Sequence, residues 1–239
     1  MKKIFMAAIA AACTLAAAAQ TKDYTLRLED FDELRVVDGI NVEVSCSEDS
    51  AGMVTFTCAP ALADVLMFES GKGRLKVQVA IGEDGPRTGL PTVHAYCSTL
   101  TRVENSGDSI VAVSLTGPQT QFKARVIGNG TIVADGIYTN AAEGRISTGH
   151  GHIVMRGKAA RVKLSNIGTG PIEAGALTAK EVKCWVLGTG DIDCNASESL
   201  NIVGAGSGTV YYTGSPKTLT NRSIGVKAVQ VGEPTDTEE

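Results

Sequence analysis

Several residue types are scarce in this chain, and each shortage narrows the range of possible functions. Aromatic residues make up 5% of the 239 residues, with one Trp and three His. So few histidines leave little material for general bases or imidazole metal ligands. Lys and Arg number 22 against 26 Asp and Glu, which gives a formal net charge of -4. A nucleic-acid-binding protein usually carries a basic excess, so nucleic acid is not expected as a partner.

Motifs of catalysis and cofactor binding are also missing. The sequence has no P-loop, nucleophile elbow, zinc-protease helix or dinucleotide fingerprint. It has no Cys-x-x-Cys pair, which argues against a zinc site. Of its six cysteines only Cys13 precedes residue 20, and the other five are an odd number, so at least one stays unpaired within the chain. We therefore expect neither an enzyme nor a bound cofactor.

The first 19 residues have the pattern of a secretory signal peptide. A short basic start is followed by apolar residues 4–15 and by the small residues Ala17 and Ala19. This pattern predicts export to the periplasm, the outer surface or the medium. Cys13 is an alternative lipid-attachment site, but Ala stands where Leu is usual three residues before it. No later segment is apolar enough to span a membrane.

From about residue 120, one short unit recurs along the chain. It reads Gly-x-Gly and then, two residues later, Ile or Val. The first glycines of successive copies are 21, 19, 20 and 18 residues apart, at Gly128, Gly149, Gly168, Gly188 and Gly206. A degenerate copy follows at Gly225, with Lys227 in place of the second glycine. Apolar residues alternate on both sides of each bend, which predicts two short strands per unit. The glycines would supply the backbone freedom that the bend needs.

Units of this kind bury their apolar side only when they stack as coils. Equivalent residues then form ladders, and the clearest ladder is Ile132, Ile153, Ile172, Ile192 and Val210. Independent hairpins would have no reason to repeat the same residue type at the same place. A left-handed β-helix usually shows a six-residue sub-repeat, which is missing here. The prediction is an all-β, right-handed parallel β-helix-like solenoid with rungs of ~20 residues.

The part before the repeats is less regular. Residues 31–46 read as strands around a turn at Asp38 and Gly39, and residues 54–58 and 74–79 read as further strands. A short helical turn is expected between Pro60 and Phe68. If residues 31–46 and 54–58 pair as a hairpin, Cys46 and Cys58 come close together.

These segments combine into one predicted domain over residues 20–231, with an irregular part at 24–100 and a repeat part at 101–231. Residues 82–91 read as a surface loop, and the acidic tail at 232–239 is predicted to be disordered. The N-terminal strands would cap or extend the solenoid, since open solenoid ends need covering. An oligomer could cover them instead.

The ordered set of motifs resembles a known family. Phe31-x-x-Leu34-x-Val36-x-x-Gly39-Ile40-Asn41, then Gly73-x-Leu75-x-Val77, then the Gly-x-Gly-x-Ile repeats are similar to the putative auto-transporter adhesin head GIN domain. That family is named for a Gly-Ile-Asn tripeptide, and the similarity covers roughly residues 25 to 225. The resemblance implies a right-handed β-helix exported by Bacteroidetes-type bacteria and a role in adhesion. It implies no particular ligand and no catalytic residue.

A candidate ligand site lies around the single tryptophan. Alternation points Trp185 outward, with Lys163 and Lys183 on one outward ladder beside it and Lys123 two rungs before. An exposed indole flanked by cations can stack on a sugar ring or an acidic glycan. The alternative is that Trp185 packs under the N-terminal segment or against another subunit.

Two candidate clusters have less specific signals. Glu173 and Asp193 occupy equivalent rung positions and should stack ~5 Å apart, which raises a carboxyl pKa or attracts a metal cation such as calcium. A solvated acidic face is the alternative. His150 and His152 could contact a metal, or could simply occupy a solvated turn.

A further pair faces the interior of one rung. Cys184 and Cys194 are both predicted to point inward, ten residues apart. They are expected either to form a disulfide or to stay as buried thiols.

The favoured function is an exported adhesin-like binding protein of the bacterial cell envelope that recognises a glycan or a protein through its solenoid surface. The alternatives are a polysaccharide-degrading lyase or hydrolase on a β-helix scaffold, and a structural envelope component. The short turns leave little room for the long loops that usually surround a β-helix active site, which favours the binding protein.

Overall fold

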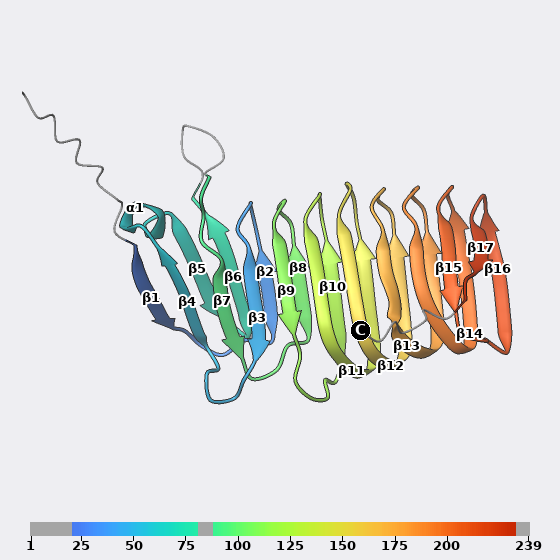
Figure 1. Ribbon diagram of the computed structural model, residues 1–239, viewed down its shortest axis with the longest axis horizontal. Helices are drawn as coiled ribbons and strands as arrows, with labels where there is room; N and C mark the ends of the chain where they lie inside the picture. The colour runs from blue at the N-terminus through green and yellow to red at the C-terminus, as the bar shows by residue number, and fades with distance from the viewer. Residues whose placement is uncertain (1–20, 81–87, 233–239) are drawn as a thin grey trace, which may run out of the picture.

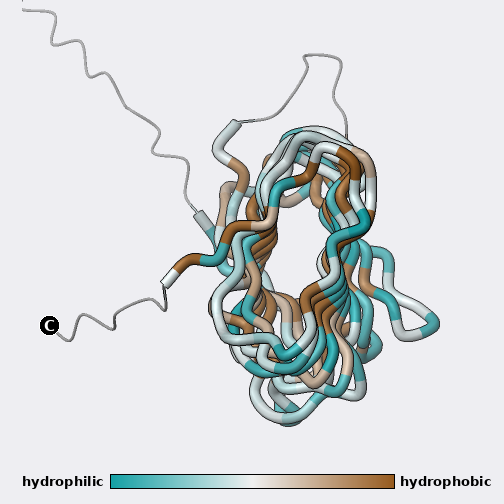
Figure 2. The backbone as a smooth tube through the Cα atoms, turned by 90° about the vertical axis from the view of Figure 1, so that its right-hand side faces the viewer, coloured by the Kyte–Doolittle hydropathy of each residue, from teal (hydrophilic) through white to brown (hydrophobic). Residues whose placement is uncertain are grey.

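The computed structural model describes residues 21–80 and 88–232. Its strands join into one 17-stranded sheet that winds around a single axis, and the coils stack side by side along that axis (Figure 1). Seen down the axis, the coils superimpose as a flattened oval (Figure 2). The predicted all-β solenoid is confirmed. The predicted signal peptide at 1–19 lies outside the described residues, as do most of the loop at 82–91 and all but Gly232 of the tail at 232–239.

The repeat part consists of long strands that each pass around one bend of the oval. They are β11 (Thr131–Ile146), β12 (His152–Asn166), β13 (Ile172–Val186) and β14 (Ile192–Ala205), preceded by β10 (Phe122–Val126). The first half of each long strand lies on one face of the solenoid and the second half lies on the other. All of these strands pair in parallel, one coil against the next.

The apolar ladder predicted from the repeat is confirmed residue by residue. Ile132, Ile153, Ile172, Ile192 and Val210 are successive in-register partners. All five side chains are 0% exposed. The fixed spacing of the repeat therefore places the same apolar residue at the same point of the core in every coil.

Close stacking of the coils, more than backbone freedom, explains most of the repeat glycines. Gly128 and Gly149 have left-handed φ angles of 108° and 80°, but Gly168, Gly188 and Gly206 are not among the residues with positive φ. A Cβ on Gly168 would lie 2.5 Å from the Gly149 carbonyl oxygen of the preceding coil. The expectation that the bend needs glycine for its flexibility is thus wrong for these three copies, where the neighbouring backbone leaves no space for a side chain.

The part that looked irregular in sequence continues the solenoid with a permuted order of coils. Its strands are β2 (Glu33–Val36), β3 (Val42–Cys46), β6 (Arg74–Val79), β7 (Val93–Cys97), β8 (Arg102–Asn105) and β9 (Ile110–Ser114). Strand β2 pairs in parallel with both β6 and β8, and β3 pairs with both β7 and β9. The coil formed by β2 and β3 therefore lies between two coils that follow it in sequence (Figure 1).

Antiparallel strands cover the first end of the solenoid, as the capping prediction required. Strand β1 (Lys22–Arg27) pairs with β4 (Met53–Cys58), β4 pairs with β7, and β5 (Leu66–Gly71) pairs with β6. The short helix α1 (Pro60–Ala63) confirms the expected helical turn. The expected hairpin is wrong, because β4 pairs with β1 and β7 and not with β3. As a result Cys46 lies beside Cys97, with 4.0 Å between their Sγ atoms, and not beside Cys58.

The opposite end is formed by β15 (Thr209–Thr213), β16 (Thr218–Ile224) and β17 (Lys227–Gln230). Leu219 and Ile224 on β16 are 42% and 80% exposed there. In the described ranges, no helix is long and apolar enough to cross a membrane.

The five described cysteines are free thiols. Cys184 and Cys194 are 0% and 1% exposed, and a hydrogen bond with Cys194 together with burial raises the pKa of Cys184 well above its ordinary value. The two thiols thus meet inside one coil, as predicted, and their oxidation to a disulfide stays a prediction.

Peptide mapping without reduction is expected to recover residues 184 and 194 in one cross-linked species. Alkylation of both thiols after unfolding in the absence of reductant would contradict it.

Candidate functional site

The predicted lysine ladder and Trp185 lie on one face of the solenoid. The outward residues of β8, β10 and the second halves of β11 to β14 form two neighbouring ladders. One ladder contains Arg102, Lys123, Glu143, Lys163, Lys183 and Asn201, and the other contains Glu104, Arg125, Arg145, Ser165, Trp185 and Val203. We call this outward surface the basic face. The placement of Lys163, Lys183 and Trp185 on one outward surface agrees with the sequence analysis.

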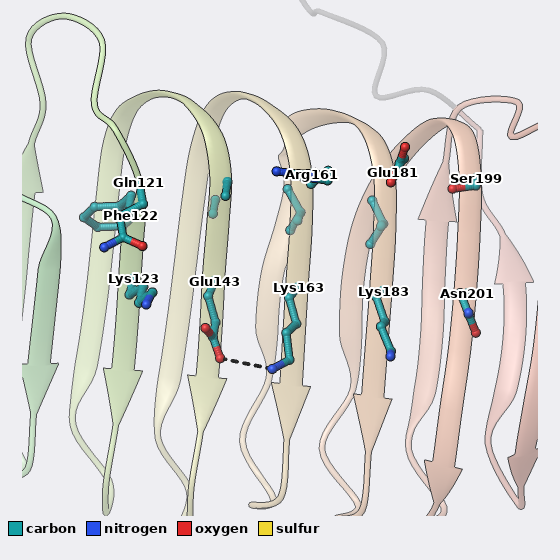
Figure 3. Close-up of a pocket in the computed structure, with 14 residues that line it drawn as sticks. Gln121, Phe122, Lys123, Glu143, Arg161, Lys163, Glu181, Lys183, Ser199 and Asn201 are labelled. Atoms are coloured by element: carbon teal, nitrogen blue, oxygen red, sulfur yellow. Dashed lines mark ion pairs between the residues drawn. The ribbon is translucent and has the colours of Figure 1, made fainter.

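A groove of about 450 Å³ runs across the basic face from β10 to β14. Lys123, Glu143, Lys163, Lys183 and Asn201 form one row along it, as Figure 3 shows. A second row contains Gln121, Arg161, Glu181 and Ser199 (Figure 3). Buried Phe122, Val162 and Val182 also line the groove. It therefore combines an apolar floor with polar walls that can donate and accept hydrogen bonds.

The two predicted lysines differ in their partners. Lys163 Nζ lies 3.6 Å from a carboxylate oxygen of Glu143, and the Lys163 side chain is 50% exposed. Lys183 forms no ion pair with any residue in the described part of the chain. Trp185 lies two positions further along β13, next to the groove, and is 42% exposed. In the described structure the N-terminal strands lie several coils away, at the far end of the solenoid (Figure 1), so they do not cover this indole.

One carboxylate with three arginines continues the basic face toward the N-terminal end. Glu104 accepts contacts from Arg35 Nε at 3.2 Å, Arg102 Nη2 at 3.4 Å and Arg125 Nη1 at 3.6 Å. The Glu104 side chain is 10% exposed, while the arginine side chains are 38–47% exposed. A single carboxylate cannot neutralise three guanidinium groups, so the cluster keeps a positive excess. Sequence reasoning missed it because Arg35 arrives on the permuted coil.

The predicted acidic pair lies on the opposite face. Glu173 and Asp193 are in-register partners on β13 and β14. Burial and the nearby Glu173 charge raise the pKa of Asp193, and backbone hydrogen bonds from Cys194 and Gly175 oppose part of that rise. Glu173 Oε1 lies 3.0 Å from His152 Nε2, whereas His150 Nδ1 lies 3.0 Å from Thr169 Oγ1. The two histidines therefore have different partners.

No group of three or more His, Cys, Asp or Glu side chains arranged to hold a metal ion occurs in residues 21–80 and 88–232. The cation site at Glu173 and Asp193 stays a prediction, with Glu173 already engaged by His152.

Comparison with protein families identifies the chain. The family model described as "Putative auto-transporter adhesin, head GIN domain" matches residues 30–216. The chain belongs to this family. The GIN tripeptide is Gly39, Ile40 and Asn41, at the turn between β2 and β3. No curated protein is similar enough to this chain to count as a relative.

Several solved structures share the fold of this GIN-domain protein. A putative adhesin from Bacteroides fragilis has a TM-score of 0.74 at 19% identity, over 89% of this chain and 97% of that one. A putative adhesin from Parabacteroides merdae has a TM-score of 0.70 at 18% identity, over 90% and 97% of the two chains. A protein from Parabacteroides distasonis described as a putative lipid binding protein has a TM-score of 0.66 at 19% identity, over 90% and 98%. At these identities the likeness shows the fold alone.

Proposed function

We propose that this GIN-domain protein is an exported, adhesin-like binding protein of the bacterial envelope that recognises a glycan through the groove of its basic face. The observation that carries the proposal is an exposed tryptophan placed beside a lysine-lined groove. The family description points to adhesion, and the first 19 residues have the pattern of a signal peptide.

The chemistry of the groove suits a sugar polymer. The Trp185 indole is 42% exposed, and an exposed aromatic ring offers a flat apolar surface for the face of a sugar ring. Lys163 and Lys183 donate hydrogen bonds to hydroxyl or carboxylate oxygens, and Glu143 and Asn201 supply acceptors. The groove crosses five strands on one flat face, so it can hold an extended chain.

The same groove argues for binding in preference to hydrolysis. Glycosidases generally use two carboxyl groups ~5–9.5 Å apart across the scissile bond. The acids in the groove are Glu143 on β11 and Glu181 on β13, and two strand spacings alone separate them by ~10 Å. Glu143 is also paired with Lys163. Release of reducing sugar from a bound polysaccharide would support the hydrolase alternative.

The Trp185→Ala variant is expected to lose glycan binding. On a broad glycan array, the unaltered protein should bind a subset of glycans, and the variant should bind them at least ~10-fold more weakly, because a stacked Trp in a binding site commonly contributes ~1.4 kcal/mol or more. The matched control is Leu187→Ala, since Leu187 is 44% exposed and follows β13 in the adjoining turn, away from the groove.

Unchanged binding in Trp185→Ala, or equal losses in both variants, would overturn the assignment of the site. Binding to surface proteins without binding to any glycan would instead favour a protein partner.

A further inference from the structure

We infer that the ligand is a linear acidic polysaccharide that lies along the solenoid axis and places its anionic groups on a basic stripe extending well beyond the groove. The inference rests on the proposed function and names the class of glycan. The basic stripe consists of the two outward ladders of the basic face, extended onto β2, β6 and β16 by their registers.

The charge of the basic stripe is opposite to that of the whole protein. On these nine strands its acids are Glu33, Glu104 and Glu143, and its cations are Arg35, Arg74, Lys76, Arg102, Lys123, Arg125, Arg145, Lys163, Lys183 and Arg222. Just beyond its end, Glu69 of β5 pairs with Lys76 at 3.3 Å. The chain as a whole has a formal net charge of -4. The excess of cations on two adjacent ladders is therefore a local feature, and it creates a positive field for an anionic ligand.

All three acids of the stripe are already paired with stripe cations. Glu33 Oε2 lies 2.9 Å from Arg74 Nη2, Glu143 pairs with Lys163, and Glu104 is shared by three arginines. In the described residues, Lys123, Lys183 and Arg145 have no carboxylate partner at all. The acids hold some cations in place and leave others available to a ligand.

The arginine end of the stripe has the donor groups that an anion subsite needs. A small pocket of about 110 Å³ is lined by Glu33, Leu34, Arg35, Arg74, Arg102 and Glu104. Guanidinium groups bind carboxylate and sulfate-like oxyanions through paired N–H donors. Because Glu104 is buried beneath them, the arginines present their remaining donors to solvent. This subsite lies several coils from Trp185, which requires a ligand long enough to reach both.

The regular spacing of the strands that carry the stripe cations suits a polymeric ligand. Neighbouring strands lie ~4.8 Å apart, so the nine strands from β6 to β16 place cations along roughly 40 Å. Glu143 and Glu181 in the groove and the exposed Trp185 indicate a ligand that also carries hydroxyl groups and ring faces. An acidic sugar chain combines the required spacing, charge and hydroxyl groups.

The test compares polymers that differ only in charge. Polygalacturonate and its methyl ester form one matched pair, and dextran sulfate and dextran form a second, with binding measured by biolayer interferometry from low to high salt. We expect binding to at least one acidic polymer, at least ~10-fold weaker binding to its neutral partner, and affinity that falls as salt rises. Longer polymers should bind more tightly than short oligomers because they reach more of the stripe.

Two double variants then locate the binding surface. Lys123→Gln with Arg145→Gln removes two stripe cations that have no carboxylate partner, and is expected to weaken acidic-polymer binding at least ~10-fold and to lower the salt dependence. Lys158→Gln with Lys227→Gln removes the same charge from exposed positions off the stripe, and should leave binding nearly unchanged. Thermal unfolding of both variants checks that they fold.

Each outcome decides the inference. Equal losses in the two double variants would overturn it, since net charge alone would then explain binding. Trp185-dependent binding of neutral glycans only would overturn it while the proposed function stands. Binding to anionic phospholipid vesicles but to no acidic polymer would also overturn it and favour a membrane surface as the ligand.

Discussion

Replacing Gly188 with Ala is expected to lower the free energy of unfolding by about 2–4 kcal/mol. The new Cβ would overlap the carbonyl oxygen of Gly168 in the preceding coil and would lie 2.9 Å from the carbonyl carbon of Ile167. Gly168 cannot shift freely, because its carbonyl oxygen accepts hydrogen bonds from the backbone N–H groups of Thr189 at 3.2 Å and Gly190 at 3.3 Å. The variant must therefore separate two coils or break these bonds.

Gly39→Ala is the matched control, and guanidinium unfolding followed by circular dichroism is the measurement. A Cβ on Gly39 meets nothing within 4 Å, and Gly39 is not among the residues with positive φ. Its substitution should change stability by no more than about 0.5 kcal/mol. If Gly188→Ala were as stable as Gly39→Ala, the coils would not be packed as closely as the structure has them.

The repeat part was predictable because its period determines both local structure and pairing. Once each unit begins at the same glycine, equivalent residues must become neighbours, and the Ile132 to Val210 ladder follows without further information. The same argument placed Lys163 beside Lys183 and turned Trp185 outward. These predictions depend on spacing and alternation, which a sequence displays directly.

The permuted coil was not predictable, because alternation identifies a strand but not its partners. Strand β2 is inserted between β6 and β8 by contacts with segments about 40 and 70 residues away. Asn41 of the GIN tripeptide shows how the insertion is held: its backbone oxygen accepts from Val93 N at 3.0 Å, and its Oδ1 accepts from Ile110 N at 2.9 Å. One residue thus joins the coils on both sides.

The proposed binding surface likewise has one part that could be predicted from the sequence and one part that could not. The ladder of Lys163 and Lys183 lies on consecutive repeats and was predicted from the sequence, whereas the groove along it was not. The cluster of Arg35, Glu104 and Arg125 depends on the permuted coil, since Arg35 is in register with Glu104 only after β2 pairs with β8. Without that pairing, these residues are separate charged positions on strands with no assigned neighbour.

Asn105→Ala is expected to cost about 2–4 kcal/mol, because this side chain links two coils inside the protein. Asn105 is 0% exposed. Its Nδ2 donates to the carbonyl oxygens of Ser109 at 2.8 Å and Thr131 at 3.2 Å, and Thr131 belongs to the next coil. Its Oδ1 accepts from Gly107 N at 3.1 Å and Ser109 Oγ at 3.4 Å. Removing the amide leaves four polar groups without this partner.

Asn166 provides the comparison, because it stands at the equivalent position two residues before the first glycine of its repeat. It is also 0% exposed, and its Nδ2 donates to Gly170 O at 2.9 Å and Asp191 O at 3.3 Å. Its Oδ1, however, is buried with no hydrogen-bond partner among the described residues. With half as many bonds to lose, Asn166→Ala should cost only about 1–2 kcal/mol.

Guanidinium unfolding of both variants tests which of them loses more free energy of unfolding, and Asn105→Ala is expected to lose more. If Asn166→Ala were the more damaging change, the hydrogen bonds within the turn and to the next coil could not be what makes the asparagine important. The backbone conformation of the turn would then be the better explanation for the need for asparagine at this position. The expected order instead ties the stability of each bend to the number of hydrogen bonds that its buried amide makes, since both variants remove the same atoms from the same position of a coil.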